Sequence, residues 1–129
     1  MDRERFYDLG SIGGMAMGLR YPWRGNGGDL PPRPEYAPLW HATLRSLLMQ
    51  VRLTLLIGRH ARLYCLRTHH ETAADSVRRW QNFLSAGYFP LPHHPSTRDT
   101  HRLKNRRWFE AEVLPALRTA VTSAMEASL

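Results

Sequence analysis

The pattern of apolar and polar residues along the chain predicts an alternation of helices and strands. Residues 39–50 repeat apolar side chains at helical spacing, which predicts a helix with one buried stripe. That stripe comprises Trp40, Leu44, Leu47 and Leu48. Residues 51–57 run through apolar and β-branched side chains almost without interruption, so we expect a strand that is covered on both faces.

Two further segments have the pattern of strands. Residues 86–92 form a short apolar and aromatic run that ends in prolines. Residues 11–19 are small and apolar, and glycines interrupt them. A glycine inside a strand marks a place where another part of the molecule approaches the backbone closely, so we expect a closely packed strand over residues 11–19.

Three more helical segments complete the prediction. Residues 59–66 and 73–84 have helical patterns, and Thr72 is placed to cap the second of them. The apolar face of residues 73–84 comprises Val77, Trp80 and Leu84. A final helix begins near Trp108, and Pro115 should kink it because proline lacks the N–H that a helix interior uses.

The order of these elements predicts an α/β fold with a mostly parallel sheet of about three strands. No internal repeat or linker divides the sequence, so we expect residues 1–129 to form a single domain. The length of 129 residues is enough for one modest core, and 43% hydrophobic and 22% charged residues are typical of a globular protein.

Residues 20–38 form a long segment rich in proline and glycine, and a loop of this length within a domain is usually functional or disordered. The prolines favour a loop of fixed shape. It combines flat aromatic rings with cations, namely Arg20, Tyr21, Trp23, Arg24 and Arg33. That mixture suits single-stranded or flipped nucleic acid, and it also suits a loop whose aromatic rings fold onto the core.

The charge of the chain is consistent with a nucleic-acid partner. The formal net charge is +7, and Lys104 is the only lysine, so almost all of the positive charge is arginine. Arginine forks bind phosphate and stack on bases, so DNA is the first candidate partner. Genomic base composition explains a high arginine content equally well, with exposed arginines that only solvate the fold.

Cysteine usage and hydropathy argue against several classes of protein. The single cysteine, Cys65, cannot form an internal disulfide, and one thiol is too few for a zinc or iron–sulfur site. We therefore expect no metal and no cofactor, and a buried, unreactive Cys65. No apolar run is long enough to cross a bilayer and no secretory leader opens the chain, so we expect a cytoplasmic protein without a membrane partner.

The run His69-His70-Glu71 contains metal-ligating residue types. It lacks the i, i+4 spacing that directs two imidazoles at one ion on a helix. A solvated turn is therefore the favoured interpretation, and a metal site is the alternative.

Residues 93–99, His-His-Pro-Ser-Thr-Arg-Asp, follow the predicted strand over residues 86–92 and precede a basic stretch. Open α/β sheets bind ligands in loops at this end of their strands. Pro95 fixes the backbone beside His94, and an imidazole held in this way can donate a hydrogen bond to charge developing on a leaving group. Taken alone, the same residues are also typical of an ordinary turn.

Several segments together resemble the bacterial uracil-DNA glycosylase superfamily, in the family's order and across nearly the whole chain. They are residues 17–22 (Met-Gly-Leu-Arg-Tyr-Pro), 28–35, 37–41, 52–58, 94–98 (His-Pro-Ser-Thr-Arg) and 108–115 (Trp-Phe-Glu-Ala-Glu-Val-Leu-Pro). Members of this family hydrolyse the bond between uracil and its sugar in DNA, which begins base excision repair. The resemblance implies a three-layer α/β/α sandwich with a short, mostly parallel sheet.

The resemblance also implies roles for individual residues. His94 would donate to the uracil ring oxygen on which negative charge gathers as the glycosidic bond breaks. The target base must leave the duplex first, and the loop around Ser96 would then fill the gap and contact the phosphates. The expected substrate- and DNA-binding residues are Tyr21, Pro22, Arg24, Ser96, Thr97 and Arg98.

The sequence departs from the family pattern at its beginning. Family members open with a strand and a Gly-Gln-Ala-Pro-Gly type of loop, near which an acidic residue or asparagine positions the attacking water. Residues 1–10 do not match, so we expect an N-terminally truncated domain with weak or lost excision, unless Asp29 or Asp99 takes the missing role. The alternatives are a non-catalytic DNA-binding remnant and half of a split enzyme that self-associates through an unpaired sheet edge.

Overall fold

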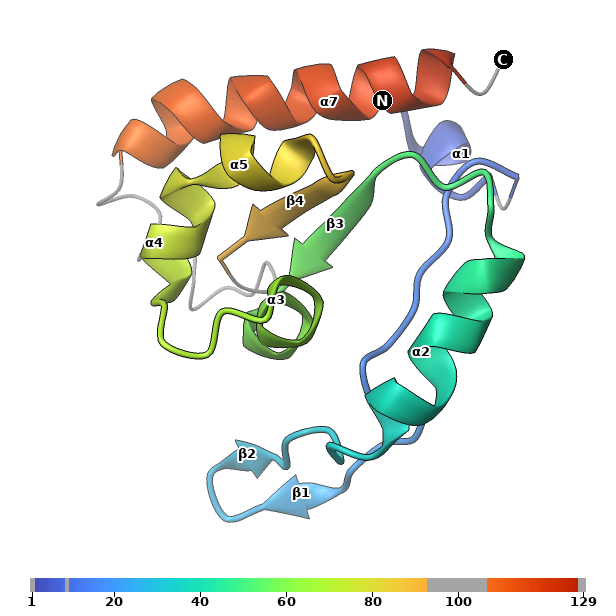
Figure 1. The fold of residues 1–129 in the computed structure, drawn as a ribbon, viewed down its shortest axis with the longest axis vertical. Helices are drawn as coiled ribbons and strands as arrows, with labels where there is room; N and C mark the ends of the chain where they lie inside the picture. Colours follow the sequence, from blue (N-terminus) through green and yellow to red (C-terminus); the bar gives the residue numbers. More distant parts are fainter. Residues whose placement is uncertain (1, 9, 93–106, 128–129) are drawn as a thin grey trace. The chain divides into compact units, whose positions relative to one another are not determined.

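The computed structural model describes residues 2–8, 10–92 and 107–127, which form helices and short strands (Figure 1). The described strands form two separate two-stranded sheets, so a mixed α/β class is confirmed. Contacts along the chain group into two units, residues 1–50 and residues 51–127. The expectation of one domain over residues 1–129 stays a prediction.

A parallel strand pair lies at the centre of residues 51–127. β3 (Thr54–Ile57) pairs with β4 (Tyr88–Leu91), so that Thr54 lies opposite Tyr88. The N–H of Thr54 donates to the carbonyl oxygen of Gly87 at 2.8 Å, at the beginning of the ladder. The parallel orientation expected of these two segments is confirmed.

β3 is shorter and more exposed than the strand predicted over residues 51–57. Leu56 is 2% exposed, whereas Leu55 and Ile57 are 38% and 45% exposed. Successive side chains of a strand point to opposite faces, so one face of β3 is buried and the other is partly open. The expectation of a strand covered on both faces is therefore wrong for the described residues, because the helices that precede β4 pack mainly on β4.

Helices on β4 form the core of residues 51–127. α4 (Ala73–Arg78) and α5 (Trp80–Leu84) precede β4, and η1 (Phe109–Val113) leads into α7 (Leu114–Glu126), which runs along α5 (Figure 1). The buried core residues are Val77, Phe89, Phe109 and Val113. Burying one such side chain contributes roughly 1.5–3 kcal/mol, so this cluster is the main attachment between the helices and the strand.

The helix predicted over residues 73–84 is divided at Arg79. The ψ of Arg79 is 23°, outside the α-helical range, so α4 ends before it and α5 begins after it. The predicted apolar face is nevertheless confirmed on both pieces. Val77 belongs to the buried core, and Trp80 and Leu84 pack against it.

α3 (Arg59–Leu66) confirms the helix predicted over residues 59–66. It begins directly after β3, at Gly58, whose φ of 88° lies in the range that favours glycine. Its fully buried residue is the cation Arg62, which is 2% exposed, rather than an apolar residue. Cys65 is half-buried in the same helix.

The sequence predicts a kink at Pro115, and the structure has a wide turn just before it. η1 is a π-helical segment, and Pro115 lies in the first turn of α7. Proline cannot donate the i→i−4 hydrogen bond and its ring crowds the preceding turn, so a π-helical turn gives the chain the room it needs. The hydroxyl of Thr119 donates to the carbonyl oxygen of Pro115 at 3.1 Å.

Residues 1–50 contain α1 (Arg3–Phe6), the antiparallel strands β1 (Arg24–Gly25) and β2 (Gly28–Asp29), and α2 (Tyr36–Leu47). The long loop predicted over residues 20–38 therefore contains a hairpin. The helix predicted over residues 39–50 is confirmed, although α2 begins and ends earlier in the chain.

Residues 11–19 form no strand, which corrects the prediction. Instead, an isolated hydrogen bond links this backbone to α2: Nε2 of His41 donates to the carbonyl oxygen of Ala16 at 3.0 Å. The close backbone approach expected from the glycines is confirmed at Gly18, where an added Cβ would lie 2.8 Å from Cβ of Pro32. A segment held by such contacts has no strand partner to satisfy its N–H and C=O groups in a ladder.

α2 buries a different face from the predicted stripe. Trp40 is 52% exposed and Leu47 is 75% exposed, whereas Ala37 and His41 are buried. The reason is that the partner of α2 is the backbone near Ala16, which offers a carbonyl group to His41 rather than an apolar surface.

Candidate nucleic-acid interface

The predicted site residues fall into two groups. Tyr21, Pro22 and Arg24 belong to the described residues and lie on or next to the hairpin of residues 1–50. The second group lies outside the described residues: His94, Ser96, Thr97, Arg98, Asp99 and the cations Arg102, Lys104 and Arg106. The described part of the predicted interface is therefore residues 21–30, called the 21–30 hairpin.

Glycine and one backbone hydrogen bond shape the 21–30 hairpin. Arg24 lies opposite Asp29 in the pairing of β1 with β2. Gly28 has a φ of 132°, which residues with a side chain rarely adopt, so the turn depends on glycine there. The N–H of Leu30 donates to the carbonyl oxygen of Trp23 at 2.9 Å and closes the base of the hairpin.

The aromatic rings of the hairpin are exposed. Trp23 is 67% exposed and Tyr21 is 54% exposed. Their centroids lie 6.0 Å apart with an angle of 65° between the rings, an edge-to-face arrangement. The alternative in which these rings fold onto a core does not describe this hairpin, and adjacent exposed rings are typical of a binding surface.

The backbone of Trp23 has an uncommon conformation. Its φ of 71° lies in the left-handed range, which for a bulky residue costs on the order of 1–3 kcal/mol. Such strain persists only where the surrounding structure imposes it. Here the hydrogen bond from the N–H of Leu30 to the Trp23 carbonyl oxygen pairs these two residues across the hairpin and holds the backbone of Trp23 in place. The sequence gives no signal for this conformation.

The carboxylate of Asp29 contacts both the Tyr21 hydroxyl and the Arg24 guanidinium. The hydroxyl of Tyr21 donates to Oδ1 of Asp29 at 2.9 Å, and Nε of Arg24 lies 4.0 Å from the same oxygen. This hydrogen bond, together with some desolvation and the negative charge of Asp29, raises the pKa of the Tyr21 hydroxyl. Asp29 thus offers an anionic oxygen to Tyr21 and Arg24, two of the residues that were predicted to bind DNA.

The positive charge of the hairpin remains open to solvent. The side chain of Arg24 is 84% exposed beside Asp29. Arg33, beyond the hairpin, forms a second exposed ion pair with Glu35 at 3.3 Å. Exposed ion pairs of this kind contribute at most about 1 kcal/mol, so a phosphate can replace either carboxylate at low cost.

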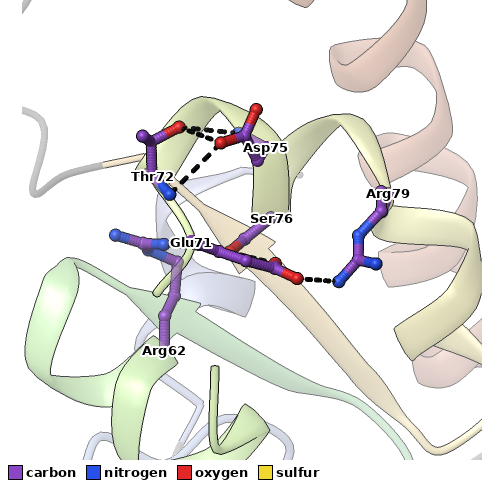
Figure 2. A network of polar contacts seen from close by, with 6 residues as sticks. All are labelled: Arg62, Glu71, Thr72, Asp75, Ser76 and Arg79. Carbon is purple, nitrogen blue, oxygen red and sulfur yellow. Dashed lines mark hydrogen bonds and ion pairs between the residues drawn. The ribbon is translucent and has the colours of Figure 1, made fainter. Parts of the chain in front are cut away.

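A second set of polar contacts lies in residues 51–127 and is called the Arg62–Arg79 cluster. Nη1 of Arg62 donates to the hydroxyl of Ser76 at 3.2 Å, and that hydroxyl donates to Glu71 at 3.3 Å. Nη2 of Arg79 donates to the other oxygen of Glu71, as Figure 2 shows. The cluster therefore joins Arg62 on α3 to Glu71, which lies before α4, and to Arg79, which follows α4.

Burial governs the chemistry of Arg62. Desolvation lowers the pKa of its guanidinium, the nearby Arg59 lowers it further, and the charge of Glu71 opposes both. Nε of Arg62 is buried without a hydrogen-bond partner, as is the hydroxyl of Thr68. The cluster is consequently a structural support, since its central cation is 2% exposed.

Thr72 begins α4 in the way that the sequence predicts. Its hydroxyl accepts from the N–H of Asp75 at 3.2 Å, and the Asp75 carboxylate accepts from the N–H of Thr72 at 3.3 Å, a capping box (Figure 2). The hydrogen bonds from the hydroxyl and the N–H of Thr72 lower the pKa of Asp75.

The remaining features of the described residues supply little further chemistry. Residues 2–8, 10–92 and 107–127 contain no group of three His, Cys, Asp or Glu side chains arranged to hold a metal, and His69 and His70 are exposed. An open apolar groove of about 510 Å³ lies between α5 and α7, lined by Trp80, Leu84 and small residues of α7. In the same ranges no helix has the length and apolar character needed to span a bilayer.

No family model matches this chain. The 21–30 hairpin is therefore the described region whose exposed rings and cation point to a function. Two features of it escaped the sequence: the left-handed Trp23 and the pairing of Asp29 with Tyr21 and Arg24. The spacing from Trp23 to Leu30 around Gly-Asn-Gly-Gly was the available signal, because such glycine-rich runs between polar residues favour hairpins.

Proposed function

We propose that this protein is a uracil-DNA glycosylase-like DNA-binding protein that contacts the DNA through the 21–30 hairpin. The observation that carries the proposal is the exposed grouping of Tyr21, Trp23 and Arg24 on one short hairpin. Exposed rings offer faces for stacking, and an exposed guanidinium offers a fork for phosphate. The net charge of +7 favours a polyanionic partner.

Catalysis in this proposal belongs to the loop that includes His94, as the family resemblance implies. A neutral imidazole at His94 donates to the oxygen of the departing uracil, and Ser96, Thr97 and Arg98 hold the phosphates beside it. The Tyr21-Pro22 segment presses on the DNA backbone. We propose that the fold is the three-layer α/β/α sandwich of that family, with a cytoplasmic location that suits a DNA repair protein.

The experiment is uracil release from a single-stranded oligonucleotide that contains one deoxyuridine. Release by the full chain, abolished in His94→Ala and retained in His70→Ala, supports an active glycosylase. His70 is a matched control, since it is an exposed histidine outside the proposed loop. Absence of release at a large excess of enzyme rejects excision by this chain.

DNA binding without excision is the second candidate function. It is favoured by the engagement of Asp29 with Tyr21 and Arg24, since this leaves the carboxylate less suited to positioning a water molecule. Salt-sensitive binding to DNA without uracil release supports this candidate. Failure to bind DNA at low salt rejects both functions.

A third arrangement, a split enzyme completed by a second copy, rests on the strand edges of the β3–β4 pair. Within the described residues β3 and β4 pair only with each other. An edge without a partner is a template for strand addition. A stable monomer at all concentrations in sedimentation would count against self-association.

A further inference from the structure

We propose that Trp23 is the residue that selects unpaired bases, by stacking its indole on a base of single-stranded DNA or on a base displaced from a duplex. This inference rests on the proposed DNA binding of the 21–30 hairpin and names the form of DNA that it binds. Stacking on an aromatic side chain does not require a particular base, because every base has a π face.

Backbone strain and solvent exposure coincide at one residue of the hairpin. Trp23 has a φ of 71° and is 67% exposed, so the fold holds an apolar ring in solvent through a backbone conformation that is itself unfavourable. Glycine or asparagine would adopt that conformation more readily. An indole that is 67% exposed gains little from burial, and a stacking partner from outside the chain would compensate for the cost of the backbone conformation.

The indole of Trp23 is restrained by its neighbours in the hairpin. Tyr21 contacts the Trp23 ring edge-to-face at 6.0 Å, and the Tyr21 hydroxyl is itself held by Asp29 at 2.9 Å. A ring that is positioned before binding loses less conformational freedom when it meets its partner. The contacts from Asp29 through Tyr21 therefore prepare Trp23 for stacking.

A cation, Arg24, follows Trp23 directly in the chain. Arg24 is 84% exposed, so a phosphate next to the stacked base has a guanidinium to contact. Stacking rings combined with cations are what single-strand binding requires. In a regular duplex the base faces are covered by their neighbours, so only the contact between cation and phosphate remains there.

The other tryptophans lack this combination. Trp80 and Trp108 are half-buried and pack against the core, and the guanidinium of Arg78 lies over the Trp108 ring at 4.5 Å. Trp40 is 52% exposed but lies on α2, away from the hairpin in sequence, with no ion pair or ring contact to a hairpin residue given by the structure. Trp40 is therefore a matched control for an exposed indole.

The test compares binding of the full chain to labelled oligothymidylate and to a duplex of equal length at one low salt concentration. Trp23→Gly removes the ring and suits the left-handed backbone, so the hairpin is preserved. We expect Trp23→Gly to weaken binding to the single strand roughly 5- to 150-fold and to leave duplex binding within about twofold. Trp23→Phe should retain part of the preference, and Trp40→Ala should bind both DNAs like the wild type.

Tryptophan fluorescence supplies an independent readout. Oligothymidylate should quench part of the wild-type emission, and that part should be absent in Trp23→Phe and present in Trp40→Phe. Equal weakening of single-strand and duplex binding in Trp23→Gly, or no weakening, overturns this inference while salt-dependent binding by the wild type keeps the proposed function. Absence of DNA binding by the wild type overturns the proposed function itself.

Discussion

The 21–30 hairpin and the Arg62–Arg79 cluster both place arginine beside one carboxylate, in opposite environments. In the hairpin, Arg24 is 84% exposed and lies 4.0 Å from Asp29. In the cluster, Arg62 is 2% exposed and reaches Glu71 through the hydroxyl of Ser76. Water competes for the guanidinium of Arg24 and is excluded from that of Arg62, so the same residue types serve binding in one region and stability in the other.

Burial decides which arginines of the described residues can exchange a carboxylate for another anion. An exposed guanidinium beside a weakly held carboxylate can exchange that partner for phosphate. A buried guanidinium cannot exchange partners in this way, because water does not reach it to replace the acceptor that it would give up. The net charge of the chain does not distinguish an arginine that can bind phosphate from one that stabilises the fold, whereas the exposure of its side chain does.

The largest expected effect concerns Glu71. Glu71→Ala removes the acceptor of Ser76 and Arg79 and leaves the buried Arg62 without a nearby negative charge, so we expect it to lower the free energy of unfolding by about 1–3 kcal/mol. Urea denaturation followed by tryptophan fluorescence measures the change.

Glu35→Ala is the matched control for Glu71→Ala. Glu35 pairs with Arg33 at the surface, so its loss should change the free energy of unfolding by less than about 1 kcal/mol. Equal destabilisation by the two variants would remove the distinction between the buried and the exposed arrangement.

An intermediate effect is expected at the capping box that begins α4. Thr72→Ala leaves the N–H of Asp75 without its acceptor and should cost about 1 kcal/mol. The pKa of Asp75 is lowered in the folded protein, chiefly by the hydrogen bond from the Thr72 side chain. That stabilisation is present above the ordinary aspartate pKa of 3.8 and is lost as the pH falls through the folded value.

The gap in unfolding free energy between wild type and Thr72→Ala should therefore shrink as the pH is lowered from 7 to 3. Denaturation series at several pH values measure it, and Thr43→Ala on α2 is a control that is not part of a capping box. A gap that widens in acid would show that Thr72 acts through something other than the ionised Asp75.

The smallest effect is expected in the hairpin. Asp29→Asn removes the negative charge that competes with phosphate for Arg24, so we expect DNA affinity at low salt to rise roughly two- to fivefold. The amide oxygen of asparagine can still accept from the Tyr21 hydroxyl, so the ring contact of Tyr21 with Trp23 is kept. The pKa of Tyr21 should fall toward its ordinary value, because a neutral amide accepts the hydroxyl proton more weakly than the Asp29 carboxylate, whose hydrogen bond is the main cause of the elevation. Fluorescence anisotropy measures the affinity, and absorbance titration against Tyr21→Phe measures the pKa.

Arg24→Ala should act in the opposite direction to Asp29→Asn. It should weaken binding and reduce the slope of log affinity against log salt by about 1, as expected for one lost phosphate contact. Weaker binding by Asp29→Asn would mean that Asp29 supports the bound conformation more than it competes with phosphate.

Local sequence signals were sufficient where short-range chemistry decides the structure. The cap at Thr72, the apolar face of Val77 and Trp80, and the parallel pairing of β3 with β4 were all predicted. Each of these depends on residues close together in the chain or on a strong strand pattern.

The errors arose where a distant partner decides burial. The stripe of α2 was assigned to Trp40 and Leu47, yet the contact that α2 makes is polar, from His41 to the carbonyl of Ala16. Hydrophobic periodicity cannot indicate that a backbone carbonyl lies opposite a helix. The hairpin was missed for a similar reason, because Tyr21, Trp23 and Arg24 in a proline-rich segment look alike in a loop or a hairpin, and only pairing across Gly28 distinguishes the two.

The buried Pro90 of β4 limits how the parallel sheet can grow. The carbonyl of Gly87 points toward β3, where it accepts from Thr54, and backbone groups of a strand alternate in direction, so Pro90 presents its backbone to the opposite edge. Proline has no amide hydrogen to offer there, so β4 lacks one rung on that side. A strand added from a second molecule would therefore extend the sheet beside β3, and a proline placed at Leu55 would close that remaining edge.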